Sequence, residues 1–270
     1  RHHIMTVTFR ILGCGSSGGV PRIHGDWGDC DINEPKNSRT RCSMLVTKSG
    51  GEGDTTALID TSPDMRTQLI DAGTVWLDAV LYTHDHADQT HGIDDLRAMV
   101  YAKRERIKVW MDTATSKTMN HRFGYCFSEI RDSNYPSILE DKRISTPYTD
   151  IEIDGAGGTL TVTPFRQVHG RIDSLGFRIG DIAYSSDISD LPEESETILQ
   201  GLDTWVVDAL RRAPHPTHFH LDKTLKMIEK IKPRRAVLTN LHIDMDYQTL
   251  IKELPPHIVP AYDGMEFCQM

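Results

Sequence analysis

The chain has 270 residues, 38% of them hydrophobic, and a formal net charge of −9 at pH 7. This length fits one large domain or two small ones, and the hydrophobic content is sufficient to bury a core. The acidic balance argues against an extended nucleic-acid-binding surface, and no apolar run approaches the roughly 20 residues that cross a membrane.

Residues 1–4 read Arg-His-His-Ile, which resembles a cloning remnant ahead of Met5, so we expect a single domain over residues 5–270. No signal-peptide pattern opens the chain. The cysteines are scattered and odd in number, which is not a disulfide framework. These features predict a cytoplasmic protein.

The first part of the chain predicts mainly strands. Residues 7–11 alternate apolar and polar side chains as a strand does. The glycine-rich segment 13–21 follows, but it lacks the lysine and the helix of a phosphate-binding loop. We therefore expect its glycines to allow close backbone packing near a site. Residues 42–47 and 56–60 predict a hairpin, and residues 64–72 predict a helix.

Helices and strands alternate in the rest of the chain. Helices are expected at residues 93–103, 113–123, 221–231 and 247–254, and strands at 107–111, 151–153, 160–165, 175–179, 182–185, 204–209 and 236–239. The segment 128–145 is expected to be irregular. Early strands followed by strand–helix alternation predict two sheets packed face to face, with helices outside.

A dense group of potential metal ligands follows the apolar run 77–82, in the sequence Thr-His-Asp-His-Ala-Asp. In an extended chain, alternate side chains point the same way, so His84, His86 and Asp88 can converge. Imidazole suits zinc, and imidazole with carboxylate suits zinc, iron or manganese. This spacing predicts a metal site rather than a solvated loop rich in histidine.

Three later residues have a similar placement at the ends of predicted strands, namely His169, Asp187 and His242. Taken alone, each could be a hydrogen-bonded loop residue. Loops at strand ends carry function on a rigid scaffold, and the repeated placement predicts that the three complete the same site.

The motif at residues 83–88, together with His169, Asp187 and the segments 12–21, 91–97 and 214–219, resembles the metallo-β-lactamase superfamily. Within it, the chain is most similar to the branch of the phosphonate-pathway cyclic phosphodiesterase and the tRNA 3′-processing endonuclease. The resemblance covers nearly the whole chain. It implies an α/β fold, a four-layer αββα sandwich, with a binuclear metal site at one edge of the sheets.

The resemblance also implies a ligand set. It places His84, His86 and His169 at the first metal, Asp187 between the metals and Asp88 at the second.

Two positions depart from the family pattern, because Gln89 and Asn240 stand where the family has histidines. His242 could substitute as a ligand near Asn240. A second site rich in oxygen favours manganese or a weakly held ion. We therefore expect Zn2+ and/or Mn2+, with one or two ions per chain.

The implied activity is hydrolysis by a metal-bound hydroxide. Asp88 is expected to orient this hydroxide, and His218 is the candidate that gives a proton to the leaving group or contacts the phosphate. The expected substrate is a small cyclic phosphodiester, such as a ribosyl cyclic phosphate or a cyclic nucleotide.

Several alternatives stay open. Cleavage of tRNA would need a long basic arm, which this acidic chain lacks. The same site could hydrolyse a lactone or a thioester. Gln89 and Asn240 also leave room for a non-catalytic, metal-dependent binding protein or a cofactor-pathway accessory protein. A homodimer is compatible with the sequence.

Overall fold

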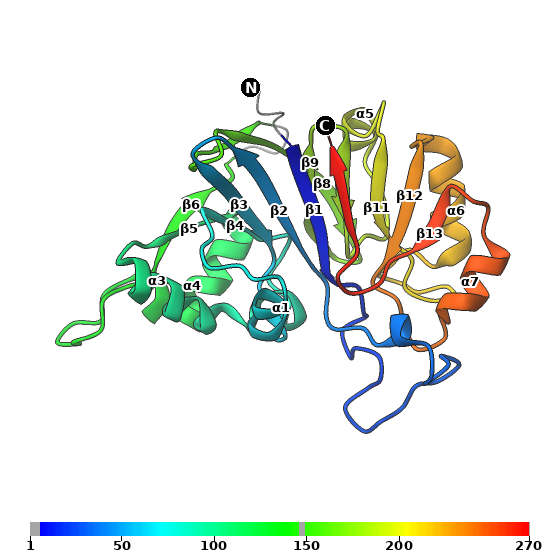
Figure 1. The fold of residues 1–270 in the computed structure, drawn as a ribbon, viewed down its shortest axis with the longest axis horizontal. Coiled ribbons are helices and arrows are strands. Elements are labelled where there is room, and N and C mark those ends of the chain that lie inside the picture. Colours follow the sequence, from blue (N-terminus) through cyan, green and yellow to red (C-terminus); the bar gives the residue numbers. More distant parts are fainter. Residues whose placement is uncertain (1–5, 146–148, 270) are drawn as a thin grey trace.

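A computed structural model describes residues 6–145 and 149–269. Residues 1–4, which we expect to be a cloning remnant, lie outside this part. Within the described residues, the strands form two seven-stranded sheets (Figure 1). The first sheet has the order β14 (Glu266–Gln269), β1 (Thr6–Gly13), β2 (Ser43–Gly50), β3 (Gly53–Ile59), β4 (Ala79–Leu81), β5 (Ile107–Met111) and β6 (Leu139–Arg143). The second has the order β13 (Ile258–Pro260), β12 (Arg235–Thr239), β11 (Thr204–Asp208), β10 (Ile182–Ser185), β9 (Ile172–Ile179), β8 (Leu160–His169) and β7 (Ile151–Ile153).

The two sheets share a core of apolar side chains from alternate strand positions. Phe9 and Ile11 of β1 are fully buried in this core, and so is Val206 of β11. Because alternate side chains of a strand point to opposite faces, the neighbours Trp205 and Val207 belong to a separate cluster on the outer face. Burial of each such side chain contributes about 1.5–3 kcal/mol.

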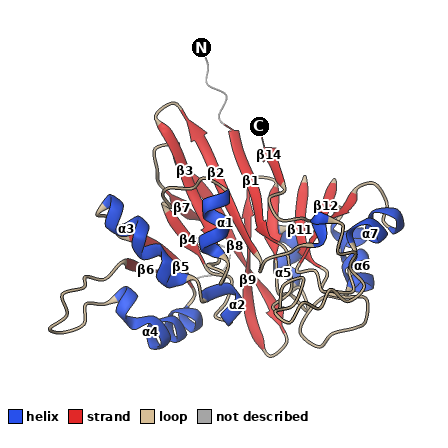
Figure 2. Cartoon of the chain, turned by 60° about the horizontal axis from the view of Figure 1, so that its bottom comes forward, coloured by secondary structure: helices blue, strands red, loops and turns tan. Residues whose placement is uncertain are grey.

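Helices cover both outer faces (Figure 2). The first sheet carries α1 (Met65–Asp71), α3 (Arg97–Lys103) and α4 (Thr113–Phe127), and the second carries α5 (Glu193–Ile198), α6 (Leu221–Ile231) and α7 (Tyr247–Glu253). Two sheets between two layers of helices confirm the predicted αββα sandwich. Within the described residues, no helix is long and apolar enough to cross a membrane.

Several elements differ from the prediction. The segment 128–145 is not wholly irregular, because it contains β6, which pairs in parallel with β5 although Leu139 is its one buried side chain. The helix predicted over 93–103 divides into a 3-10 turn (Ile93–Leu96) and α3. The prediction missed α5, β13 and β14. These elements are short, and a short edge strand is specified by the strand that it pairs with rather than by its own pattern.

The strand ends that carry polar residues meet at one edge of the second sheet. β8 and β10 are both antiparallel to β9, so they run in the same direction, and β10, β11 and β12 are parallel to one another. The carboxyl ends of strands with a common direction lie side by side. His169, Asp187, Asp208 and Asn240 stand at or just after these ends.

Candidate metal centre

Three histidines converge at this edge. The rings of His84 and His86 have centroids 4.5 Å apart, and the ring of His169 lies 5.0 and 5.1 Å from them. One ring nitrogen from each lies within 4.8 Å of the others. His84 and His169 are buried, whereas His86 is exposed at the mouth of the group. The structure thus brings together residues from the first sheet and the second.

The position of the proton on His84 follows from its neighbours. The hydroxyl of Thr83 donates a hydrogen bond of 2.8 Å to Oδ2 of Asp60, so it accepts one of 2.9 Å from Nδ1 of His84. Nε2 of His84 then carries a lone pair, is buried and has no partner among the described residues. Burial lowers the pKa of His84 to about 3, which keeps the ring neutral. A buried, unpartnered acceptor beside two imidazoles is the environment of a metal ligand.

His169 and His218 are oriented in the same way. Nδ1 of His169 donates to the carbonyl oxygen of Thr217 at 2.6 Å, and Nδ1 of His218 lies 2.7 Å from Oδ2 of the fully buried Asp208. The Nε2 atoms of both rings lie 3.8 Å from Oδ1 of Asp187. His169, Asp187 and His218 therefore form a second group whose ligand atoms lie within 4.8 Å of one another.

The carboxylates determine the charge of this second group. Burial would lower the pKa of His218, but Asp208, Asp187 and Asp88 outweigh it and raise this pKa to about 9. Burial raises the pKa of Asp208 to about 6. Burial also opposes ionisation of Asp187, yet the surrounding histidines hold its pKa below the usual value.

Asp88 does not continue the extended segment, contrary to the prediction. The chain turns after His86 into a short helix, α2 (Ala87–Thr90), and Asp88 lies in its first turn. Its side chain still lines the cavity beside the histidines, and burial together with Asp187 raises its pKa to about 6. The next residue, Gln89, is fully buried, and its Nε2 donates to Oδ2 of Asp88 at 3.1 Å and to Oδ2 of Asp187 at 3.0 Å.

His242, a predicted ligand, lines the same cavity but joins neither ligand group found in the described part of the chain. Its Nε2 contacts Nη2 of Arg22 at 2.6 Å, and its Nδ1 contacts Oδ1 of Asp244 at 3.2 Å. An arginine can only donate, so the lone pair on Nε2 of His242 is already used. This contact holds the Arg22 guanidinium beside the cavity.

The cavity over the ligand groups has a volume of about 400 Å³ and a polar lining. Residues 16–18 of the glycine-rich segment and the side chains of Arg22 and Arg211 contribute to it, and Leu210 is the one aliphatic side chain among its lining residues. In the described part of the chain, Arg211 has no carboxylate partner, and Arg22 has only Asp26 at 3.7 Å. Two cations with little neutralisation therefore face the cavity.

Three strand ends at this edge turn through left-handed backbone. The φ angles of Asp60, Asp187 and Asn240 are 64°, 51° and 62°. Non-glycine residues rarely adopt this region, and Asp and Asn tolerate it best. Backbone strain of this kind clusters at functional sites, where the surrounding structure holds it in place.

The donor set fits a divalent cation. His84, His86 and His169 offer nitrogen lone pairs, and Asp187 offers a carboxylate oxygen in contact with the same group. Nitrogen and oxygen ligands in this number suit zinc, and they also suit manganese or iron.

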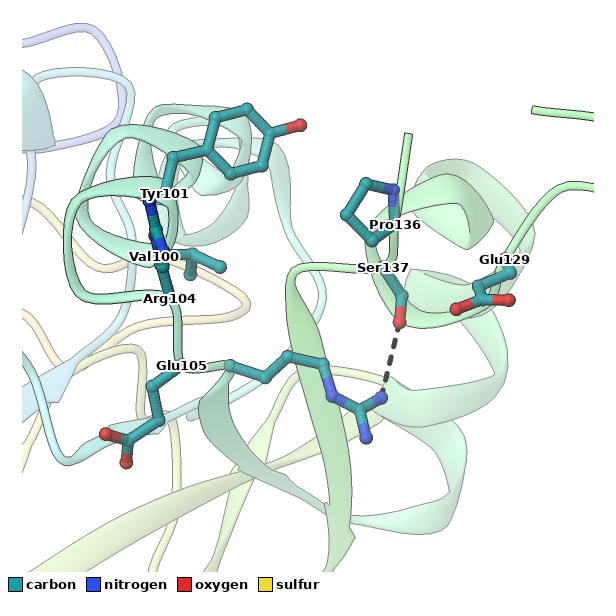
Figure 3. A pocket seen from close by; sticks show the side chains of 8 residues that line it. Val100, Tyr101, Arg104, Glu105, Glu129, Pro136 and Ser137 are labelled. Atoms are coloured by element: carbon teal, nitrogen blue, oxygen red, sulfur yellow. Dashed lines mark hydrogen bonds between the residues drawn. The ribbon is translucent and has the colours of Figure 1, made fainter. Parts of the chain in front are cut away.

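A larger cavity, of about 530 Å³, lies between α3 and the segment after α4 (Figure 3). Tyr101 lines one side, Glu129 and Pro136 line the other, and Arg106 donates to Oγ of Ser137 at 3.2 Å. No histidine is among its lining residues. Cavity volume therefore does not identify the functional site; the chemistry of the lining does.

Sequence reasoning missed three residues of the site. Asp60 and Asp208 each follow or end an apolar strand, as Asp187 does, and this shared signal could have identified them. Arg22 gave no such signal, because its partner His242 is 220 residues away in the chain.

Comparisons with known proteins agree with this geometry. The family described as the β-lactamase superfamily domain matches residues 55–243. A solved structure described as a new diphosphatase from the PhnP family is 32% identical, has a TM-score of 0.86 and is matched over 98% of both chains.

Other relatives are partial or more distant. An octanoyltransferase of Porphyromonas gingivalis (strain ATCC BAA-308 / W83) is 33% identical over 262 residues, which are 95% of this chain but 50% of that protein. The chain thus spans about half the length of this curated relative. Zinc-bound PqqB from Methylobacterium extorquens and the short form of human tRNase Z share the fold, with TM-scores of 0.71 and 0.60 and identities of 18% and 16%. Each is matched over 96% of this chain, and over 99% and 98% of its own.

Proposed function

Because the chain belongs to the β-lactamase superfamily, whose fold it shares with a PhnP-family diphosphatase, we propose that it is a metal-dependent hydrolase of the phosphodiesterase type. One observation carries this proposal. Ring nitrogens of three histidines, two of them oriented by hydrogen bonds, converge beside a histidine–carboxylate pair, next to a polar cavity with two arginines in its lining.

His84, His86, His169 and Asp187 are the residues that would hold the ion. When bound, a divalent cation polarises a phosphoryl oxygen and makes a water molecule acidic enough to act as a nucleophile at neutral pH. Thr83 and Asp60 keep His84 in the tautomer that leaves Nε2 free, and the carbonyl of Thr217 does the same for His169. Asp88 lies at the cavity wall, where its carboxylate can orient the attacking water.

His218 is the residue we assign to protonation of the leaving oxygen. Its Nδ1 is fixed by Asp208, so its Nε2 is directed toward Asp187 and the cavity. A phosphodiester needs such a donor when its leaving group is a basic alkoxide.

The substrate is proposed to be a small anion. Arg22 and Arg211 bring positive charge to the cavity of a chain whose net charge is −9, and such focusing favours an anionic ligand. A small cyclic phosphodiester, such as a ribosyl cyclic phosphate or a cyclic nucleotide, is the first candidate, and the diphosphatase relative adds a linear diphosphate ester. A cytoplasmic small-molecule enzyme is part of the same proposal.

A substrate panel tests the proposal. The protein, loaded with Zn2+ or Mn2+, is assayed against bis(p-nitrophenyl) phosphate, cyclic nucleotides, a dinucleoside diphosphate, a lactone and an octanoyl thioester. We expect metal-dependent hydrolysis of phosphate esters that collapses in Asp88→Ala and persists in Asp85→Ala, because Asp85 is not among the residues that line the cavity. Hydrolysis of the lactone or thioester without any phosphate ester would contradict the proposal.

The octanoyltransferase relative supports a second candidate, hydrolysis of an acyl thioester. An octanoyl chain needs an apolar slot to bury its methylene groups, each worth about 0.8 kcal/mol. The cavity offers Leu210 alone as an aliphatic lining residue. This composition favours the phosphate ester over the acyl substrate.

A further inference from the structure

We infer that the side-chain amide of Gln89 takes the place of a second metal ion, so that this chain binds a single ion at its three-histidine group. The inference deepens the proposed function and rests on it, since it concerns the metal content of the same site. It follows from counting the lone pairs that the described residues leave available.

The two ligand groups compete for one nitrogen. Both groups include His169, and Nδ1 of this ring is engaged with the carbonyl oxygen of Thr217. An imidazole with its Nδ1 protonated offers a single lone pair, on Nε2. An ion held by His84, His86 and His169 therefore uses the nitrogen that the group of His169, Asp187 and His218 would need.

One oxygen of each carboxylate that could compensate is also engaged. The Gln89 amide donates one N–H to Oδ2 of Asp88 at 3.1 Å and one to Oδ2 of Asp187 at 3.0 Å. Hydrogen bonds from an amide to an ionised carboxylate are stronger than hydrogen bonds between neutral groups. The partial positive charge on these two hydrogens stabilises both carboxylates, and it opposes a cation at the same two oxygens.

The other end of the amide shows what fixes its orientation. Oε1 of Gln89 is buried and has no hydrogen-bond partner in the described part of the chain. Leaving a buried acceptor unpaired is unfavourable. The two N–H contacts to carboxylates therefore determine the direction of the amide, rather than any contact of its oxygen.

A single ion also leaves His218 available for its proposed task. With the lone pair of His169 used at the first group, His218, Asp187 and Asp88 remain, and the Gln89 amide occupies one oxygen of each carboxylate. Asp208 then holds His218 with Nε2 directed to the cavity as a proton donor rather than as a ligand.

Metal titration of the wild-type protein is the first test. Metal-free protein is titrated with Zn2+ and with Mn2+, and the stoichiometry is read by native mass spectrometry. Electron paramagnetic resonance of the Mn2+ form distinguishes an isolated ion from a spin-coupled pair. We expect one ion per chain and the spectrum of an isolated ion. Two ions of similar affinity with a coupled spectrum would overturn the inference.

Substitution at Gln89 is the second test. Gln89→His replaces the amide by an imidazole and is expected to raise the stoichiometry from one ion to two. Gln248→His adds a histidine on the exposed side of α7. Its stoichiometry should stay at one ion per chain, so this variant controls for adventitious binding. A Gln89→His protein that stays at one ion would overturn the role of the amide. Loss of the single ion in Gln89→Leu would do so too, since it would make Gln89 a ligand.

These readouts separate the inference from the proposed function. They count ions without requiring turnover. A wild-type protein that binds no ion would refute both the inference and the proposed function. A protein that binds two ions and hydrolyses phosphodiesters would refute only the inference.

Discussion

Oδ2 of Asp208 lies 2.7 Å from Nδ1 of His218, and this carboxylate is fully buried at the end of β11. A buried carboxylate fixes the orientation of an imidazole and stabilises its protonated form. The contact therefore gives His218 a defined direction, with Nε2 on the side of Asp187.

The first prediction concerns the leaving group. His218→Ala should lower turnover of phosphodiesters with alkyl leaving groups by about 10²–10⁴-fold, and that of aryl phosphodiesters far less, because an aryloxide can leave without a proton. His215→Ala removes a neighbouring ring in the same cavity, 5.1 Å from that of His218, and should show no such difference. Steady-state kinetics on matched alkyl and aryl substrates measure the loss of turnover in each variant. Equal losses on both would mean that His218 binds phosphate or supports the loop.

The second prediction concerns the ion. His84→Ala should remove tight metal binding, because it deletes the unpartnered Nε2 at the centre of the group. His91→Ala is the matched control, since this histidine follows the same motif but its ring packs against Phe123 at 5.6 Å. Elemental analysis after dialysis measures the content. A comparable loss in both variants would contradict the ligand assignment.

The third prediction concerns the hydroxyl that orients His84. Thr83→Val keeps the shape of the side chain but removes the contacts to Asp60 and His84. Loss of such a supporting contact typically weakens metal affinity about 10–100-fold. Thr55→Val in β3 loses a hydrogen bond to the carbonyl of Gly158 and one from the N–H of Gly157, and it should cost a similar amount of stability without changing metal affinity. Competition with a chelator measures the metal affinity of each variant. Equal affinities in Thr83→Val and Thr55→Val would refute the role of Thr83.

The fourth prediction concerns the anchoring of the long segment that precedes β2. Asp246 caps α7 through the backbone N–H of Thr249 at 3.0 Å, and it also accepts from the N–H of Asp31 at 3.0 Å and from Nδ2 of Asn37 at 2.7 Å. Asp246→Ala should lower the free energy of unfolding by about 2 kcal/mol. Asp246→Asn, which can still cap the helix, should cost less. Denaturant unfolding at neutral pH compares the two.

The same residue predicts an acid dependence. Partial burial opposes ionisation of Asp246, but the N–H groups of Asp31, Thr249 and Asn37 outweigh it and lower its pKa to about 2. Because the folded pKa lies below the unfolded value of about 3.9, the stabilisation is complete above that value and is lost as the pH falls toward 2. The difference in unfolding free energy between wild type and Asp246→Asn should therefore shrink between pH 5 and pH 2. A difference in unfolding free energy that stays constant over this pH range would contradict the prediction.

Local patterns were sufficient for much of the architecture. The hairpin of β2 and β3, the strand β5 and the helix α6 lie where alternation and helical periodicity predict them. The sequence patterns did not predict the short elements β6 and α5, because each buries a single side chain and so has no periodic apolar face. β14 was missed for a related reason, since its pairing with β1 joins opposite ends of the chain.

The spacing of residues along the chain already indicates which chemistry is present. His84 and His86 are two residues apart in an extended segment, so they lie side by side whatever the rest of the chain does. Asp187 and His169 could be picked out because each ends or follows a strand.

How these groups are used depends on contacts that form only when the chain folds. The turn of α2 after His86 carries Gln89 to Asp187, 98 residues away, and the return of the chain after β12 brings His242 to Arg22. Asp208 becomes the partner of His218 because parallel strands end at a common edge. Spacing along a chain determines which neighbours share a face, whereas contacts between distant residues depend on which strand ends the packing of the two sheets brings together.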